Sequence, residues 1–206
     1  MNAQTERLEI AGPAGRIQLL RDHPEGTPQG TAVIAHPHPL FGGTMDNKVV
    51  QTLARAFVQA GWTSIRFNFR GVGESEGLHD EGRGEAEDLV AVVRQAAPEG
   101  PLALGGFSFG SFVTVQALQT LWSERDVRKL VLVGTAASRF AVPALPPEAH
   151  ERALVVHGEQ DDTVALSAVL DWARPQSLPV TVIPGGEHFF HGKLPLLKSL
   201  VLRHLS

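Results

Sequence analysis

The sequence predicts an α/β protein with a mostly parallel central sheet, helices on both faces and an antiparallel N-terminal hairpin. From Thr31 onward, short continuously apolar stretches alternate with stretches of helical spacing, which is typical of parallel strands buried on both faces. Before Thr31, the alternating runs RLEIAG and RIQLLRD flank the turn-forming Gly12, Pro13 and Gly15, which indicates an antiparallel pair. The chain has 206 residues, of which 43% are hydrophobic and 19% charged, so we expect one domain over residues 1–206.

The apolar and helical stretches give an expected order of elements. The strands after the hairpin are expected at Ala32–Ala35, Ser64–Phe69, Leu102–Gly106, Lys129–Gly134, Ala153–His157 and Val180–Ile183. The helices are expected at Lys48–Ala60, Gly84–Ala97, Phe109–Leu121, Ala165–Arg174 and Lys193–His204. The stretch Ser138–His150, rich in Pro and Ala, is predicted to be irregular and is too short for a cap domain.

Composition excludes several classes of function. The 18 basic and 22 acidic side chains give a net charge of −4, which offers no basic surface for nucleic acid or anionic lipid. The chain has no cysteine, which excludes disulfides, thiolate metal sites and a cysteine nucleophile. The N-terminal run MNAQTERLEI lacks the basic start and apolar core of a secretion signal, so we expect a cytoplasmic location.

One segment, Gly100–Ser123, is uncharged and long enough to span a bilayer. It contains Pro101, four glycines and several polar residues, which favour a buried strand followed by a buried helix. We therefore expect no membrane segment.

The motif GFSFG, Gly106–Gly110, matches GxSxG directly after a predicted strand and directly before a predicted helix. A serine on such a sharp turn exposes its hydroxyl, the flanking glycines leave room for the strained backbone, and the helix points its N-terminal amides at any anion formed there. The context predicts Ser108 as a nucleophile.

A second match, GESEG at Gly73–Gly77, also follows a strand, but no helix follows directly. Ser75 lies between Glu74 and Glu76, and two adjacent carboxylates would oppose a developing oxyanion. We interpret Ser75 as an ordinary loop serine.

A serine hydroxyl becomes a good nucleophile only when a base takes its proton, so a histidine and a carboxylate are needed downstream. Asp161 and Asp162 follow the strand ALVVHG, and His188 follows the strand VTVI. These residues and Ser108 then lie at the carboxyl ends of strands, the edge at which open α/β sheets bind ligands.

Five blocks in this order resemble the α/β-hydrolases, and more narrowly the small, capless bacterial serine hydrolases of that superfamily that are usually described as esterases. The blocks are HPHPLFGGTMDNKVV, RFNFRGVGESEG, GFSFGS, HGEQDDTV and GEHFFHG. The resemblance runs from about Thr31 to Gly192 and implies the α/β-hydrolase fold without a cap domain. It also implies Ser108 as nucleophile, Asp161 as the acid and His188 as general base.

Two of these roles have rivals. Asp162 is the alternative acid, but it lies immediately before the helix expected near Val164 and fits the N-cap of that helix, so the motif offset favours Asp161. His191 is the alternative base, and the match to the family position favours His188.

An oxyanion hole needs two backbone donors, one of which is the amide after the nucleophile, that of Phe109. The second is expected from HPHPL, where Pro37 and Pro39 have no amide hydrogen and leave His38 or Leu40 as the donor, with position suggesting His38 ahead of Leu40. This turn departs from the familiar glycine-rich loop. The prolines are expected to stiffen it.

Four histidines could alternatively be metal ligands, because they form an HxH pair and an HxxH pair. These residues are His36, His38, His188 and His191. We favour structural roles for His36, a buried turn residue, and for His157 beneath the acid loop, so no metal and no cofactor are expected. Asp46 and Asn47 fit the cap and first turn of a helix. The phenylalanines near the motifs are expected to divide between core and an acyl pocket, and they are Phe41, Phe107, Phe109, Phe189 and Phe190.

The sequence therefore predicts a serine hydrolase that cleaves esters of short acyl chains through an acyl-enzyme. Its partner is a small-molecule ester, and the chain is expected to be a monomer or weak homo-oligomer. The alternatives are a non-catalytic binding module of the same fold, and thioester or amide hydrolysis or acyl transfer by the same three residues.

Overall fold

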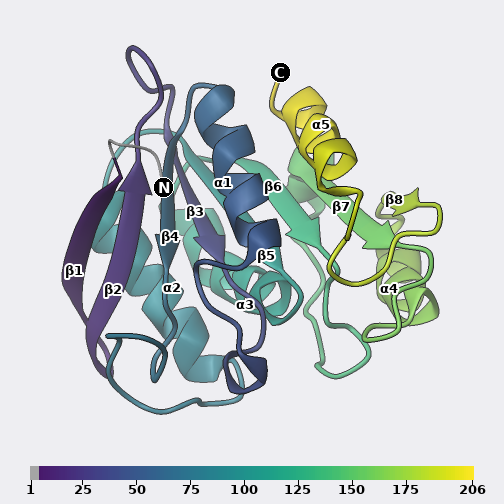
Figure 1. Cartoon of the computed structure of the whole chain (residues 1–206), viewed down its shortest axis with the longest axis horizontal. Coiled ribbons are helices and arrows are strands. Elements are labelled where there is room, and N and C mark those ends of the chain that lie inside the picture. Colours follow the sequence, from purple (N-terminus) through teal and green to yellow (C-terminus); the bar gives the residue numbers. More distant parts are fainter. Residues whose placement is uncertain (1–4) are drawn as a thin grey trace.

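The computed structural model describes residues 5–206, and within this range eight strands form one sheet. The strands are β1 (Glu6–Gly12), β2 (Gly15–Asp22), β3 (Thr31–Ala35), β4 (Thr63–Phe67), β5 (Leu102–Phe107), β6 (Val127–Val133), β7 (Ala153–Gly158) and β8 (Val180–Ile183). Their order across the sheet is β1-β2-β4-β3-β5-β6-β7-β8, so β1 and β8 lie at the two edges (Figure 1).

The pairing of neighbouring strands gives their directions. β1 and β2 form an antiparallel hairpin with Gly12 opposite Gly15 at the turn, and β2 pairs antiparallel with β4. All other neighbours are parallel. Every residue of β4 and β5 is buried, as expected for central strands covered on both faces. The predicted mostly parallel sheet with an N-terminal hairpin is confirmed.

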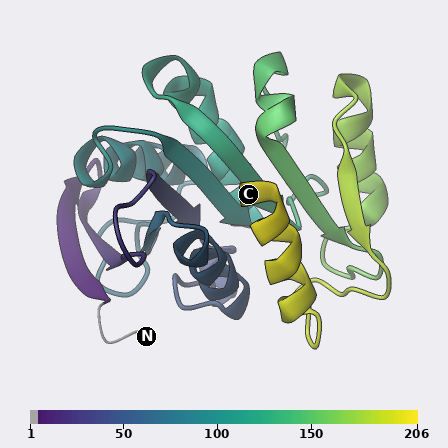
Figure 2. The ribbon, with the colours of Figure 1, turned by 90° about the horizontal axis from the view of Figure 1, so that it is seen from above.

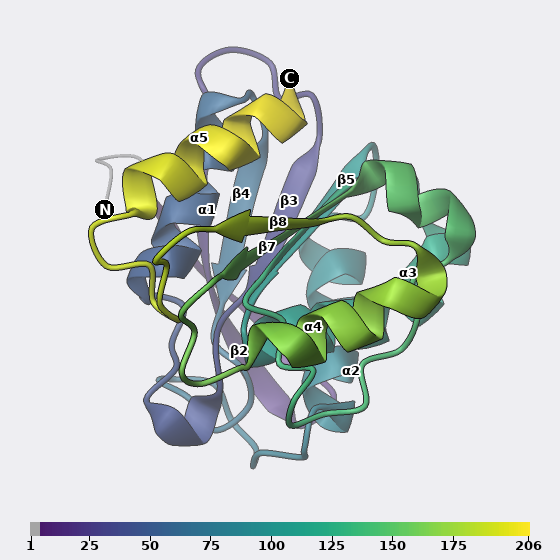
Figure 3. The ribbon, with the colours of Figure 1, turned by 90° about the vertical axis from the view of Figure 1, so that its right-hand side faces the viewer.

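Helices cover both faces of the sheet (Figure 2). The helices are α1 (Lys48–Gln59), α2 (Arg83–Ala96), α3 (Phe109–Glu124), α4 (Leu166–Ala173) and α5 (Leu194–Leu205). One apolar cluster joins one face of the sheet to α1 and α5, and the other joins the opposite face to α2, α3 and α4. Figure 3 shows this layering at the edge strand β8, with α5 and α4 on opposite sides.

The expected elements agree with the structure to within three residues at each end, apart from short 3-10 helices at Pro39–Phe41, Pro147–Arg152 and Arg174–Gln176. Asn47 caps α1, because its side-chain oxygen accepts the amides of Val49 and Val50. The interpretation of Asp162 as a helix cap is wrong. Helix α4 begins only at Leu166, and the Asp162 carboxylate accepts the neighbouring Thr163 hydroxyl instead.

The segment Gly100–Ser123 forms β5 and most of α3, both largely buried. None of the helices in residues 5–206 combines the length and the apolar character needed to cross a bilayer. The first four residues of the run examined for a secretion signal, and of the expected domain, lie outside the described residues.

The connection between β6 and β7 carries no inserted domain, and its one regular element is the 3-10 helix Pro147–Arg152. Leu145 and Ala149 of this connection are buried in the core, and the carbonyl of Pro143 accepts the indole N–H of Trp172 at 2.9 Å. The stretch Ser138–His150, predicted to be irregular, is therefore packed against the sheet and α4.

A buried ion pair fixes the loop that leaves β4. The guanidinium of Arg70 donates two hydrogen bonds to the carboxylate of Asp88 on α2, at 2.9 and 2.8 Å. The Asp88 side chain is almost fully buried. Removing one partner would leave an uncompensated buried charge, which is strongly destabilising, so the pair holds this loop against the helix layer.

Candidate active site

The ends of three parallel strands bring Ser108, His188 and Asp161 together. Ser108 directly follows β5, Asp161 lies three residues beyond β7, and His188 lies five residues beyond β8. Nε2 of His188 is 3.0 Å from the Ser108 hydroxyl oxygen, and Nδ1 of His188 is 2.7 Å from a carboxylate oxygen of Asp161. All three residues are buried to at least nine-tenths.

Ser108 sits on a strained turn between β5 and α3. Its φ of 56° and ψ of −118° are unusual for a residue with a side chain. A Cβ at Gly106 would lie 2.4 Å from the carbonyl oxygen of Gly110, and one at Gly110 would lie 2.4 Å from that of Ala35. Both glycines of GFSFG are therefore required by close backbone approach, and the turn they permit presents the serine hydroxyl to His188.

The acid is fixed by its own loop. One carboxylate oxygen of Asp161 accepts the amides of Thr163 and Val164, at 2.9 and 2.7 Å, while the other faces His188. Burial alone would raise the pKa of Asp161, but these hydrogen bonds outweigh it and the pKa lies below its usual value. The carboxylate is ionised at neutral pH and can orient a histidine.

His157 lies beneath this loop, as expected. Its Nε2–H donates to the carbonyl of Val164 at 2.9 Å, and the same nitrogen is 3.5 Å from Asp161. Burial lowers the pKa of His157, which keeps the ring neutral. The residue supports the acid loop from the strand end.

The imidazole of His188 is held so that each nitrogen has one role. Its Nδ1–H donates to Asp161, which leaves Nε2 free to accept the Ser108 hydroxyl proton. The ring packs 5.0 Å from that of Phe107 and 5.1 Å from that of Phe189, measured between centroids. This arrangement can pass a proton from the serine hydroxyl to the imidazole.

The amide of His38 is available as the second oxyanion donor. In the turn His38–Gly43, the amide of Leu40 donates to the His38 ring, and those of Phe41, Gly42 and Gly43 donate to backbone carbonyls. The amides of His38 and Phe109 have no hydrogen-bond partner among residues 5–206, and both residues line the cleft with Ser108. The geometry thus favours His38 over Leu40, whose side chain projects into solvent.

His36 directly follows β3, two residues before this turn, and is fully buried. Its Nε2 accepts the amide of Phe69 at 3.0 Å, so its proton is on Nδ1, which donates to the carbonyl of Pro37 at 2.6 Å. Burial lowers the pKa of His36 to about 4, and the Pro37 hydrogen bond offsets only part of this effect. The neutral ring joins the turn to the loop after β4, as a structural histidine does.

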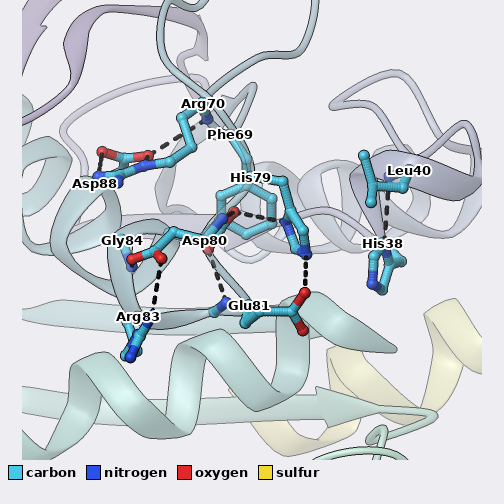
Figure 4. Close-up of polar contacts among 12 residues, drawn as sticks. His38, Leu40, Phe69, Arg70, His79, Asp80, Glu81, Arg83, Gly84 and Asp88 are labelled. Carbon is cyan, nitrogen blue, oxygen red and sulfur yellow. Dashed lines mark hydrogen bonds and ion pairs between the residues drawn. The ribbon is translucent and has the colours of Figure 1, made fainter.

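A second histidine–carboxylate pair lies beside the turn, and Figure 4 shows its histidine, His79, with Asp80 and Glu81 next to it. Nδ1 of His79 is 2.8 Å from a carboxylate oxygen of Glu85, which is fully buried and also accepts the amides of Asp80 and Gly82. The centroid of the His79 ring lies 4.9 Å from that of the His38 ring. The pKa of His38 lies below its usual value, mainly because of burial and next because of the nearby His79 ring. Sequence reasoning missed this pair, although its residues follow GESEG directly in the run GLHDEGRGE.

A cleft of about 310 Å³ opens in front of Ser108. It is lined mainly by the proline, glycines and aromatic side chains of the loops around it, with a few polar groups. Its lining residues are Pro37, His38, Phe41, Gly42, Gly43, Asn47, Ser108, Phe109, Ala136, Arg139, Phe140, Thr163, Val164, His188 and Phe189. Phe41 and Phe189 stand at the rim, with 77% and 43% of their surface exposed, whereas Phe107 and Phe190 lie in the core.

A further cavity of about 370 Å³ lies against α1 and is lined by Asp22, Arg66 and residues of the helix. No serine or histidine lines this cavity, so it offers no pair of a hydroxyl and an imidazole such as Ser108 and His188.

His191 and Ser75, the alternatives to His188 and Ser108, do not contact the group formed by Ser108, His188 and Asp161. The exposed His191 contacts Glu187 through its Nδ1 rather than Ser108. The Ser75 hydroxyl is buried, where it donates to the carbonyl of Asn68 and accepts the amide of Gln18. Across residues 5–206 no three or more His, Asp or Glu side chains are grouped so that they could hold a metal ion.

Comparisons with known proteins agree with the fold. A family model described as alpha/beta hydrolase fold matches residues 38–152. A solved structure from Xanthomonas campestris, described as an α/β serine hydrolase without lid, is 34% identical, with 100% of this chain and 95% of that chain covered and a TM-score of 0.87. An α/β serine hydrolase homologue from Coxiella burnetii is 38% identical, with 98% and 97% covered and a TM-score of 0.83. An uncharacterized protein of Rickettsia prowazekii is 30% identical over 91% of this chain and 83% of its own length.

Stability at acidic pH tests the role of His36. Unfolded His36 regains its ordinary pKa of 6.5, so below that pH the unfolded chain binds the proton first, and stability falls until the pH reaches about 4. Between pH 7.5 and 5.0 this residue is expected to cost about 2 kcal/mol of unfolding free energy. Urea denaturation at both pH values measures the free energy of unfolding. Between pH 7.5 and 5.0, the decrease in this free energy should be about 2 kcal/mol smaller in His36→Gln than in wild type. Equal losses in the two proteins would contradict a neutral buried His36.

Proposed function

The chain belongs to the α/β-hydrolase family, and on that premise we propose that it is a serine hydrolase that cleaves carboxylic esters of short acyl chains. The observation that carries the proposal is the continuous hydrogen-bond chain from Ser108 through His188 to Asp161. A serine hydroxyl bonded to an imidazole that is itself oriented by a carboxylate is the arrangement that activates serine for acyl transfer.

In the first half of the reaction, Oγ of Ser108 attacks the ester carbonyl carbon while its proton moves to Nε2 of His188. The carbonyl oxygen becomes an oxyanion, which the amides of Phe109 and His38 bind. Because these donors are fixed before the substrate arrives, they stabilise the transition state without reorganisation. When the carbon–oxygen bond to the alcohol breaks, His188 returns the proton to the leaving alkoxide, and the acyl group stays on Ser108.

In the second half, water replaces the alcohol. His188 takes a proton from water as its oxygen bonds to the acyl carbon, the oxyanion is bound by the same amides, and the bond to Oγ breaks with return of a proton to Ser108. The products are one carboxylic acid and one alcohol, and water is the only co-substrate. Asp161 stays ionised throughout and stabilises the imidazolium that forms in each half.

The shape of the cleft supports short acyl chains. The cleft measures about 310 Å³, and the connection between β6 and β7 provides no inserted domain to cover it. The apolar lining around Phe109 and Phe140 can hold a few methylene groups, whereas a long chain would extend past the rim into water.

Replacing the nucleophile tests the proposal. Ser108→Ala removes the group that forms the acyl-enzyme and is expected to lower kcat for p-nitrophenyl butyrate by at least about a thousandfold. Ser75→Ala removes the serine of the second GxSxG match and should leave kcat/KM within about twofold, measured at a temperature at which both variants give native circular dichroism. Wild-type turnover in Ser108→Ala, or loss of turnover in Ser75→Ala alone, would reject the assignment.

The acyl-length proposal predicts the order of rates in a series of p-nitrophenyl esters. We expect kcat/KM to peak between the acetate and the hexanoate and to fall by about tenfold or more at the laurate, because the added methylenes find no apolar surface. Each ester is measured below its critical micelle concentration, with Ser108→Ala as background. A preference for long-chain or emulsified esters would contradict the open, short cleft.

A further inference from the structure

We propose that Arg139 forms a carboxylate-binding subsite at the mouth of the cleft, so that the preferred substrates are esters that also carry a carboxylate. This inference rests on the proposed hydrolase function and names the substrate class for the same site. It starts from the position of Arg139, which lines the cleft together with Ser108 and His188.

The turn that carries Arg139 is well anchored. The amides of Arg139 and Phe140 both donate to the carbonyl of Ala136, at 3.1 Å each. The Phe140 ring stacks on Phe112 with 4.6 Å between centroids and packs 5.2 Å from Phe109, the residue after the nucleophile. The backbone at Arg139 is therefore fixed relative to Ser108, although its side chain reaches into solvent.

The guanidinium of Arg139 has no polar partner in the described part of the chain. Of the fourteen arginines in the sequence, twelve make a side-chain hydrogen bond or ion pair within residues 5–206, and the two that do not are Arg7 and Arg139. Arg7 is exposed on the edge strand β1, at the far side of the sheet from β8. Arg139 thus brings an uncompensated charge to the cleft.

The cleft contains no carboxylate to oppose this charge. Among its lining residues, within residues 5–206, Arg139 is the only Asp, Glu, Lys or Arg, in a chain whose net charge is −4. Asp161 lies behind His188, outside the lining. Helix α3 adds its positive N-terminal end at Phe109. Within residues 5–206, the lining of the cleft therefore carries one formal positive charge, that of Arg139, and no negative one.

Two glutamates, Glu81 and Glu85, lie against the His79 ring, which packs beside His38. Glu85 is bonded to His79, and a carboxylate oxygen of Glu81 lies 3.9 Å from Nε2 of the same ring. Neither glutamate lines the cleft. A guanidinium with all its donors free binds a carboxylate through two parallel hydrogen bonds, a geometry that a neutral ester cannot use.

The test compares anionic and neutral esters of matched shape. For a carboxylate on the acyl side, the pair is the p-nitrophenyl monoester of adipic acid and p-nitrophenyl hexanoate. For a carboxylate on the alcohol side, the pair is 4-acetoxybenzoate and its methyl ester. Wild type, Arg139→Gln and Arg7→Gln are assayed with each pair, and Arg7→Gln is the matched control because it removes an equally free charge far from the cleft.

We expect Arg139→Gln to lower kcat/KM for the anionic ester of one pair by about threefold to fivefold, as an exposed ion pair allows, through a higher KM. The neutral partner and both esters in Arg7→Gln should change by less than about 1.5-fold. Raising the salt concentration to about 0.5 M should reduce the wild-type preference, because salt screens an exposed charge.

Equal changes for the anionic and neutral esters in both pairs, with Ser108-dependent turnover intact, would overturn the subsite and leave the proposed function standing. No turnover of any of the four esters by wild type would reject the proposed function, and the subsite with it. A loss in Arg7→Gln equal to that in Arg139→Gln would show a general charge effect and would also overturn the subsite.

Discussion

The backbone of Ser108 is the constraint on which the site depends. A residue with a side chain adopts φ near 56° only when its surroundings hold it there, and here the close approach of β5, α3 and β3 does so. That approach requires the absence of side chains at Gly106 and Gly110. The same turn points the hydroxyl at His188, leaves the Phe109 amide without a partner among residues 5–206 and precedes the first residue of α3. The proposed nucleophile, one proposed oxyanion donor and the positive end of a helix dipole therefore all depend on this strained residue.

The parallel sheet supplies the remaining groups at the same edge. Because β3, β5, β6, β7 and β8 run in one direction, their carboxyl ends meet, and the loops that follow them carry the turn of His38, Ser108, Arg139, Asp161 and His188. The supporting contacts hold each loop from behind. His36 bonds the turn to the loop after β4, and His157 holds the loop of Asp161. Two buried histidines thus hold the turn of His38 and the loop of Asp161 in place.

Much of the fold and the core of the candidate site could be predicted from the sequence. Apolar runs, helical spacing and the two turn glycines were sufficient for the sheet, its hairpin and the five helices, because burial on both faces leaves a clear pattern. The motif context also singled out Ser108, Asp161 and His188, which the structure brings into contact.

The sequence could not decide between the His38 and Leu40 amides, because that choice depends on which amides form hydrogen bonds within the turn itself. The pairing of His79 with Glu85 and the free guanidinium of Arg139 depend on tertiary neighbours and leave no local signal. The prediction that Asp162 caps a helix was wrong because α4 begins at Leu166 and Ala165 occupies its N-cap position.

The central claim is that His188 activates Ser108, and covalent labelling tests it without knowledge of the substrate. A fluorophosphonate loses fluoride when an activated serine oxygen bonds to its phosphorus, so intact-mass and peptide analysis reports both the extent and the position of labelling. The account predicts one adduct per chain, on Ser108, and labelling slower by at least about a hundredfold in His188→Ala. An adduct on another serine, no adduct on the folded protein, or unchanged labelling in His188→Ala would contradict it.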